Sequence, residues 1–312
     1  MSIATARPID VHANSVVDRF MRHRLAVISA IILGVLVALA LLAPAIEAML
    51  GTNAETVDLL ARYGPASAAH PLGTDELGRD VLVRLLYGGR VSLFVGLTAT
   101  LAAAIIGTAI GLFAGYAGGR VDALVMRVTD GVIALPVLPL LIVLAAVDLG
   151  KLGLPDSIVS AENVSLYRIV AIVALVGWTT VARLVRASTL SLKTRPFILA
   201  AQAQGADKFR VMFRHILPNL ASPIIVATTL SVGNVILLES VLSFLGLGIQ
   251  PPLPSWGNIL TGAQNTIWEA PGLAFYPGML IFVTVIAFNF IGDGLQDALD
   301  PRARDRRAAE QH

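Results

Sequence analysis

The residues that could carry chemistry are few in this chain, and no familiar catalytic pattern connects them. Gly150-Lys151 is the only Gly-Lys pair, and Leu152 follows it where a phosphate-binding loop requires Ser or Thr. The five histidines form no H-E-x-x-H pair, no serine lies in a G-x-S-x-G elbow, and cysteine is absent. The sequence therefore predicts that the chain by itself is not an enzyme, holds no metal and binds no cofactor.

Two polar side chains lie in or beside a long apolar segment and could contact a transported solute. Asn234 lies inside the uncharged segment 215–238, and Glu239 follows it directly. An unpaired charge is costly in apolar surroundings, so such a carboxylate is either hydrogen-bonded within its own bundle or lines a polar pathway. Both interpretations are open for Glu239, and we take Asn234 and Glu239 as candidate pathway residues.

The loop 191–219 carries the most informative pattern. Pro196 can begin a short helix, Gly205 can end it, and Asp207 can cap a second helix, which Pro218 is expected to end. The second helix has one apolar stripe at i, i+3, i+4 and i+7: Phe209, Met212, Phe213 and Ile216. This stripe could rest on lipid, or it could dock in the groove of a partner protein.

The composition places these features in a membrane protein. Hydrophobic residues make up 56% of the chain and charged residues 14%, and the mean hydropathy is +0.77. A soluble domain carries about 25% charged residues, so this chain cannot cover a water-exposed surface. A cytosolic enzyme, a nucleic-acid-binding module and a disordered tail are therefore excluded. We expect a lipid bilayer around the chain and no nucleic acid among its partners.

Six segments are long and apolar enough to cross a membrane as helices, which predicts an all-α fold. A helix needs about 20 mostly apolar residues to span the hydrocarbon core. The third span contains Pro136 and Pro139, and the fourth reaches full length only if Arg183 and Arg186 extend to one membrane face. The predicted spans are 25–46, 91–119, 131–147, 169–182, 215–238 and 270–292.

The distribution of Lys and Arg predicts the orientation of these spans. The segments that alternate with the outer loops hold 17 of the chain's 23 basic residues: four in 1–25, two in 118–130, seven in 183–219 and four in 297–312. Cytoplasmic loops carry the excess of basic residues in membrane proteins. We therefore expect both termini and the loop 191–219 in the cytoplasm.

The first outer loop, 47–90, is expected to contain a short amphipathic helix. Thr74 could cap this helix, and the pair Gly88-Gly89 could end it. Its leucines and valines fall on one face, so it is expected to lie on the membrane or on its own bundle.

The outer loop 245–276 is rich in Pro and Gly and has no Lys or Arg. Trp256 and Trp268 suit the membrane interface. The loop could be re-entrant at that interface, or it could line the outer mouth of a pathway. The other outer loop, 149–168, is polar and carries no chemical motif.

A longer pattern in the cytoplasmic loop resembles the EAA motif of ABC importer permeases. The loop reads LAAQAQGADKFRVMFRHILPN over 199–219, with Leu199 where the motif usually has Glu. The matching positions are Ala200, Ala201, Gly205, Leu217 and Pro218. Four further stretches are similar to the DppC/OppC side of the dipeptide, oligopeptide and nickel permeases: 70–88, 114–130, 242–260 and 286–302. The resemblance covers about residues 15–303.

The resemblance implies a type I ABC importer permease fold in the bacterial inner membrane. Its implied partners are a homologous second permease subunit, two ATPase subunits that bind Mg-ATP, and an extracytoplasmic solute-binding protein. The motif would then be the coupling helix that sits in a cleft of an ATPase while the bundle alternates between outward and inward access. The implied coupling residues are Ala200, Ala201, Gly205, Ala206, Asp207, Phe209, Met212, Phe213, Leu217 and Pro218.

The function implied by the resemblance is ATP-driven import of dipeptides or oligopeptides. Nickel, glutathione or an oligosaccharide are open as alternative substrates within the family. A self-contained secondary transporter or channel would need ion-coupling groups or an inverted repeat, and neither is clear in this sequence. The expected organisation is a cytoplasmic segment 1–24, a first span 25–46, an outer loop 47–90, a five-helix core 91–296 and a cytoplasmic tail 297–312.

Overall fold

The computed structural model describes residues 16–153 and 155–300, and this part of the chain is helical without a β-strand. Most of the expected N-terminal segment and the tail beyond residue 300 lie outside the described residues. Five helical segments are long and apolar enough to span a membrane: α2 (Arg24–Leu41), α4 (Val81–Ala117), α8 (Val164–Leu192), Lys208–Phe244, which ends in α11 (Leu217–Phe244), and α13 (Gly272–Leu299). The predicted all-α membrane fold is confirmed.

Shorter elements connect these spans. Before α4 lie α1 (Val16–Arg22), α3 (Ala43–Leu50) and η1 (Leu59–Ala61). Between α4 and α8 lie α5 (Gly119–Ala134), α6 (Val137–Ala145), η2 (Gly150–Leu152) and α7 (Asp156–Val159). Around α11 lie α9 (Pro196–Ala203), α10 (Lys208–Arg210), the π-helical η3 (Val211–Ile216) and α12 (Trp256–Thr266).

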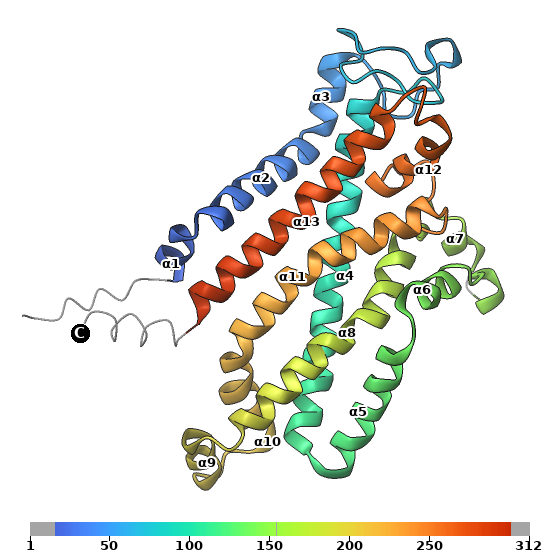
Figure 1. Ribbon diagram of the computed structural model, residues 1–312. Helices are drawn as coiled ribbons and strands as arrows, with labels where there is room; N and C mark the ends of the chain where they lie inside the picture. Colours follow the sequence, from blue (N-terminus) through green and yellow to red (C-terminus); the bar gives the residue numbers. More distant parts are fainter. Residues whose placement is uncertain (1–15, 154, 301–312) are drawn as a thin grey trace, which may run out of the picture.

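Figure 1 shows a bundle with two distinct ends. The turn between α4 and α5 and helix α9 lie at the lower end, and α1 and the end of α13 lie towards it. The loop 51–80 and the start of α13 lie at the upper end. Helix α4 runs between the two ends and packs along α8, while α13 packs on α2 and α11.

Helix α4 can pack closely on α8 because three glycines on one face have no side chains. These are Gly107, Gly111 and Gly115, spaced four residues apart. A Cβ atom at Gly107 would lie 2.5 Å from a backbone oxygen of α8, and one at Gly111 would lie closer still. Small residues at this spacing let membrane helices approach through van der Waals contact, since lipid supplies no hydrophobic driving force between them.

The predicted amphipathic helix of the outer loop is wrong. Thr74 lies in a turn, bridged to Asp80, and Asp80 caps α4 by accepting a hydrogen bond from the Val83 amide at 2.8 Å. Helix α4 then continues without a break through Gly88 and Gly89. These glycines face Trp256, and a Cβ atom at Gly89 would lie 3.1 Å from its ring. Gly88-Gly89 thus marks a close approach between α4 and Trp256. The expected boundary at residue 90, between the outer loop and the core, falls inside α4.

The predicted third span is not one straight helix. Its residues divide between α5 and α6, which are bent by 87° at a break that contains Leu135 and Pro136. Proline cannot donate the backbone hydrogen bond that would continue α5. The bent pair counts as a sixth candidate span, so the number of spans depends on how it crosses the bilayer.

The predicted fourth span is longer than expected, and its arginines are paired. Arg186 binds Asp122 of α5 through two hydrogen bonds, 2.8 Å from Nε to Oδ1 and 2.5 Å from Nη2 to Oδ2. Arg183 forms an ion pair with Asp130 of α5. The arginines therefore fasten α5 to α8, whereas the sequence suggested that they only extend to a membrane face.

The loop 245–276 folds back onto the bundle. Ser255 caps α12 in a capping box with Asn258, and Trp256 is buried at 2% exposure with its Nε1 donating to the Leu85 oxygen at 3.0 Å. Trp256 is therefore a core residue, contrary to the expected interfacial position. Trp268 is 95% exposed, as an interfacial residue would be.

Candidate coupling loop and pathway residues

Residues 196–216 form a compact hairpin at the lower end of the bundle, called the lower hairpin below. Pro196 occupies the first turn of α9, and Gly205 turns the chain with φ +83°. Asp207 then caps α10 by accepting a hydrogen bond from the Arg210 amide at 2.7 Å. Glycine adopts this left-handed conformation without the steric cost of a side chain. These three local features agree with the sequence analysis.

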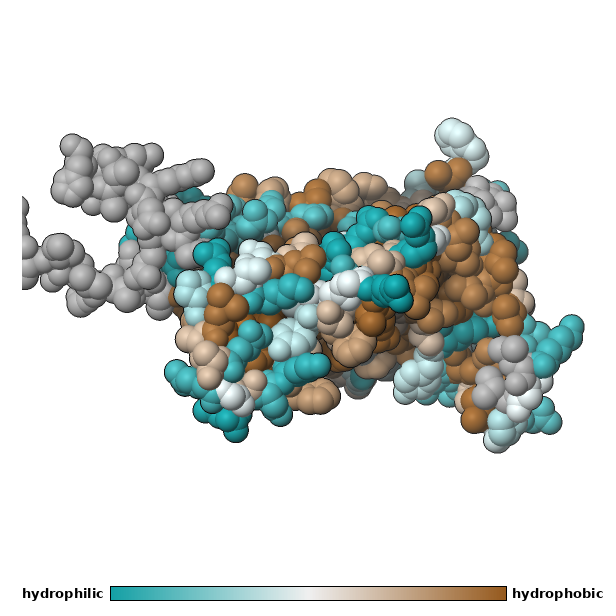
Figure 2. All heavy atoms as spheres, turned by 90° about the horizontal axis from the view of Figure 1, so that it is seen from below, coloured by the Kyte–Doolittle hydropathy of each residue, from teal (hydrophilic) through white to brown (hydrophobic). Residues whose placement is uncertain are grey.

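Most of the predicted coupling residues are exposed, on the lower hairpin and at the start of α11. Figure 2 shows this end of the bundle, where hydrophilic side chains gather with hydrophobic ones between them. The exposed predicted residues are Ala200, Gly205, Asp207, Phe209, Phe213 and Pro218, while Ala201, Ala206 and Leu217 are half-buried. Leu199, in the place of the usual Glu, is 52% exposed beside the exposed Phe197. The hairpin thus presents accessible apolar side chains among polar ones.

The predicted apolar stripe divides between two surfaces. Met212 and Ile216 are buried in a cluster with Ile198, whereas Phe209 and Phe213 are 69% and 58% exposed. The cause is the π-helical turn, in which the Leu217 amide donates to the Met212 oxygen five residues earlier. More residues per turn rotate the following side chains away from the α-helical stripe. The expectation that Pro218 ends the helix is also wrong, since Lys208–Phe244 is one continuous helical segment.

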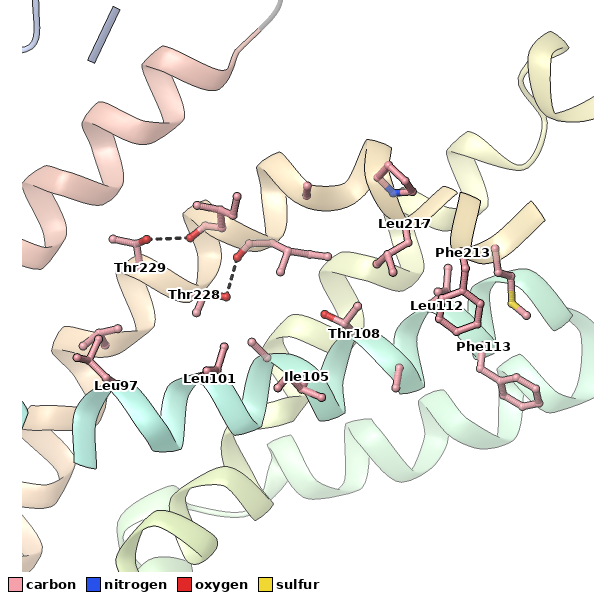
Figure 3. A pocket seen from close by; sticks show the side chains of 18 of the residues that line it. Leu97, Leu101, Ile105, Thr108, Leu112, Phe113, Phe213, Leu217, Thr228 and Thr229 are labelled. Carbon is pink, nitrogen blue, oxygen red and sulfur yellow. Dashed lines mark hydrogen bonds between the residues drawn. The ribbon is translucent and has the colours of Figure 1, made fainter. Parts of the chain in front are cut away.

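The exposed phenylalanines stand at one end of an apolar groove of about 860 Å³ between α4 and α11. Figure 3 shows Leu97, Leu101 and Ile105 of α4 along the groove, with Leu97 at the end opposite Phe213. Two hydroxyls in the wall are already partnered, because Thr228 donates to the Ile224 oxygen and Thr229 to the Ile225 oxygen. Because these hydroxyls already have partners, the wall can face apolar surroundings without leaving a polar group unpaired.

Glu239, the first candidate pathway residue, is enclosed at 0% exposure. Ser243 donates to its Oε1 at 2.7 Å, and Ser92 of α4 donates to its Oε2 at 3.2 Å. Ser92 Oγ also lies 3.2 Å from the backbone nitrogen of Trp256, from which it accepts a hydrogen bond. This cluster therefore ties α4, α11 and α12 together, which favours the interpretation of Glu239 as a residue bonded within its own bundle.

Asn234, the second candidate, is exposed and lines a cavity of about 300 Å³. The cavity lies between the bent pair α5–α6 on one side and helices α4, α8 and α11 on the other. Its position is compatible with the predicted pathway role.

Comparison with known proteins places the chain in a family. The model of the binding-protein-dependent transport system inner membrane component matches residues 107–305, and the N-terminal transmembrane domain of oligopeptide transport permease C matches residues 14–63. The chain belongs to this family of permeases. The permease thus carries both the family's membrane domain and the additional N-terminal helix.

Individual relatives cover nearly the whole permease. A dipeptide transport system permease protein, DppC, from Alkalihalophilus pseudofirmus is 41% identical over 91% of this chain and 88% of its own. The glutathione transport system permease protein GsiD from Pectobacterium atrosepticum is 40% identical over 92% and 90%. The oligopeptide transport system permease protein OppC from Bacillus subtilis is 37% identical over 92% and 88%. The resemblance found in the sequence motifs is confirmed.

Sequence reasoning missed the partners that fix the permease's buried polar groups. Ser243 stands four residues after Glu239, a spacing that places both on one helix face and could have been recognised. Ser92 lies 147 positions from Glu239, and Asp122 lies 64 positions from Arg186. No local pattern indicates such pairs.

Proposed function

We propose that this permease is one of two membrane subunits of an ATP-driven importer of short peptides and forms half of its translocation pathway. The observation that carries the proposal is the lower hairpin, a rigidly capped turn that exposes apolar side chains at one end of a membrane-spanning bundle. Relatives over nine-tenths of the chain bear the names of dipeptide and oligopeptide permeases.

The lower hairpin is proposed to lie in the cytoplasm together with both termini. Of the 23 Lys and Arg residues, 17 fall in the four segments assigned to that side. Helix α1, the end of α13 and α9 also lie towards the same end of the bundle, as this topology requires. A reporter that is active only in the cytoplasm should therefore be active when fused after residue 312.

The proposed role of the lower hairpin is to transmit movement from ATPase subunits. The exposed Phe209 and Phe213 would contact the partner, while Ile198, Met212 and Ile216 anchor the hairpin to the bundle. Mg-ATP would bind to the ATPase subunits, because this chain has no phosphate-binding loop. An extracytoplasmic binding protein would deliver the peptide to the upper end.

Glutathione is a second candidate substrate, and the GsiD relative favours it. Glutathione is itself a tripeptide, so both candidates belong to one chemical class. The discriminating experiment is uptake of labelled dipeptides, oligopeptides, glutathione, an oligosaccharide and nickel by a strain that lacks this gene, with and without the gene restored. Peptide uptake that returns with the gene supports the proposal. If no peptide is taken up and an oligosaccharide or nickel is, the proposal is wrong.

A further inference from the structure

The cavity beside Asn234 has a lining that differs from the apolar groove of Figure 3. It carries neutral hydrogen-bonding groups from three helices: Thr100 of α4, Thr179 and Thr180 of α8, and Ser231 and Asn234 of α11. The hydroxyls of Thr179 and Ser231 donate within their own helices, to the Val176 and Ala227 oxygens, which leaves Thr100, Thr180 and Asn234 as the groups that set this lining apart. Its remaining wall is apolar and includes Val137 and Leu141 of α6 and Val176 of α8. Asn234, Ile133 and Val137 are exposed, so the cavity is open between α11 and the bend of α5–α6.

The hydroxyl of Thr100 has no hydrogen-bond partner among the described residues, although the residue is only 2% exposed. A buried hydroxyl without a partner costs about 1–3 kcal/mol, and helical threonines usually bond a carbonyl of the preceding turn. Thr228 and Thr229 do so in the apolar groove (Figure 3). Thr100 therefore lines the cavity with a hydroxyl that is covered in the empty site and whose donor and acceptor are used by no described residue.

The lining also limits the chemistry of a ligand. No side chain in the wall is ionisable, so the site cannot neutralise a charged group or bind a bare metal ion as carboxylates and imidazoles do. Hydroxyl and carboxamide groups both donate and accept, which matches the N–H and C=O of a peptide bond. The apolar wall can receive a side chain. A volume of about 300 Å³ lies at the lower limit for ligand pockets, so the site would hold part of a peptide.

We propose that this cavity is a peptide-backbone subsite in which Thr100 and Asn234 hydrogen-bond an uncharged peptide group of the substrate during its passage. The inference rests on the proposed import of peptides and adds how this chain recognises them. The charged ends of the peptide, which in a dipeptide lie one carbon from this group, face the opening beside the exposed Asn234.

The test uses the complete importer in proteoliposomes, with a fixed and saturating amount of peptide-loaded binding protein. Thr100→Val and Asn234→Ala should each lower the uptake rate of labelled Ala-Leu about 3- to 10-fold, because each removes one hydrogen bond between neutral groups. The temperature of unfolding should not fall in Thr100→Val, since the lost hydroxyl has no partner in the empty cavity.

Matched controls are available on the same two helices. Thr108→Val on α4 and Thr228→Val on α11 remove hydroxyls that face the apolar groove, and their uptake should stay within about twofold of the wild type. Gly177→Val tests the apolar wall. A Cβ atom there meets only the Ala103 Cβ at 3.4 Å, so the added methyl groups should slow Ala-Leu uptake more than Gly-Gly uptake.

The outcomes separate this inference from the proposed function. If the wild-type importer carries no peptide, the proposed function fails and the subsite fails with it. If it carries Ala-Leu and both Thr100→Val and Asn234→Ala match the wild type, only the subsite is refuted. Equal losses in the two groove controls would also refute it, because the effect would then not belong to this cavity.

Discussion

At the lower end of the bundle Gly205 turns the chain in open space, whereas at the upper end Gly78 turns it against another part of the backbone. Both have positive φ, +83° and +74°. A Cβ atom at Gly205 would meet nothing within 4 Å, but one at Gly78 would overlap the backbone oxygen of Asp58. Both turns thus require a positive φ, but Gly205 lies in free space at the lower end and Gly78 is tightly packed at the upper end.

The charged groups of the outer loop are buried more deeply than those that join α5 to α8. At the upper end Asp75 has a side chain only 5% exposed and faces Arg79 at 2.8 Å and Arg84 at 3.2 Å. Between α5 and α8 the ion pair of Arg183 and Asp130 is about half exposed, at 51% and 53%, and in that of Arg186 and Asp122 the side chains are 33% and 12% exposed. Water screens exposed pairs and leaves them weak, while buried pairs are costly to break.

This contrast indicates that the two ends serve different mechanical purposes. The loop 51–80 is fixed by buried contacts and can act as a stable outer cap. The lower hairpin is fixed to the bundle mainly by Ile198, Met212 and Ile216 and leaves its turn free for a partner. Substitutions should therefore destabilise the fold most at the upper end and affect transport most at the hairpin.

The largest expected loss of stability comes from Asp75→Asn. The carboxylate accepts hydrogen bonds from the amides of Leu77 and Arg79 and faces two guanidinium groups. Loss of its charge leaves the buried Arg84 without its ion-pair partner and Arg79 with only the more exposed Glu76, which should cost about 3 kcal/mol. The measurement is thermal unfolding of the detergent-purified protein. Glu76→Gln is the control, since Glu76 is 40% exposed and 3.6 Å from Arg79, and a comparable loss there would contradict the argument.

Gly78→Ala should have the next largest effect. The positive φ alone costs about 1–2 kcal/mol for an L-residue, and the overlap with the Asp58 oxygen forces the backbone of the outer loop to move. We expect a lower unfolding temperature and faster proteolysis within residues 51–80. An unfolding temperature equal to that of the wild type would show that the cap is not tightly packed.

The features predicted correctly from the sequence are those set by neighbouring residues. Pro196, Gly205 and Asp207 each determine the backbone within about four positions, so the start and the turn of the lower hairpin could be recognised. The spans follow from composition, because a long uncharged segment has no stable alternative to a membrane helix.

The features that could not be predicted depend on distant residues. Gly88-Gly89 resembles a helix stop, and only the position of Trp256 explains why these glycines lie inside α4. Arg186 resembles a residue that reaches for the membrane face until Asp122 is placed beside it. The stripe of the second helix was misread because helical periodicity assumes α geometry, which η3 does not have.

A smaller effect is expected from the ion pair that joins α5 to α8. Arg186→Ala and Asp122→Ala should each cost about 1–2 kcal/mol, since two charge-assisted hydrogen bonds are lost at a partly exposed site. Because the residues contact each other, the double variant should lose less than the two single losses combined. The same cycle for Arg183 and Asp130 should give a coupling energy below about 1 kcal/mol. Equal coupling energies for the two ion pairs would contradict the argument that the more exposed pair is the weaker one.

The smallest loss of stability, together with a large loss of transport, is expected for Gly205→Ala. The left-handed turn costs about 1 kcal/mol with a side chain, and no neighbour adds to this cost because a Cβ atom meets nothing within 4 Å. The turn should relax and shift Phe209 and Phe213 relative to the bundle. We expect normal membrane levels, weakened co-purification of the ATPase subunits and reduced uptake of peptide.

Gly51→Ala is the matched control for this prediction. Gly51 has φ +66°, meets nothing within 4 Å and lies after α3 at the upper end of the bundle. The two variants therefore carry the same strain in the same free space and differ only in their end of the molecule. If both reduce uptake equally, the loss reflects backbone strain alone. If only Gly205→Ala does so, the hairpin turn itself is what the ATPase subunits engage, and its open surroundings are the space that they fill.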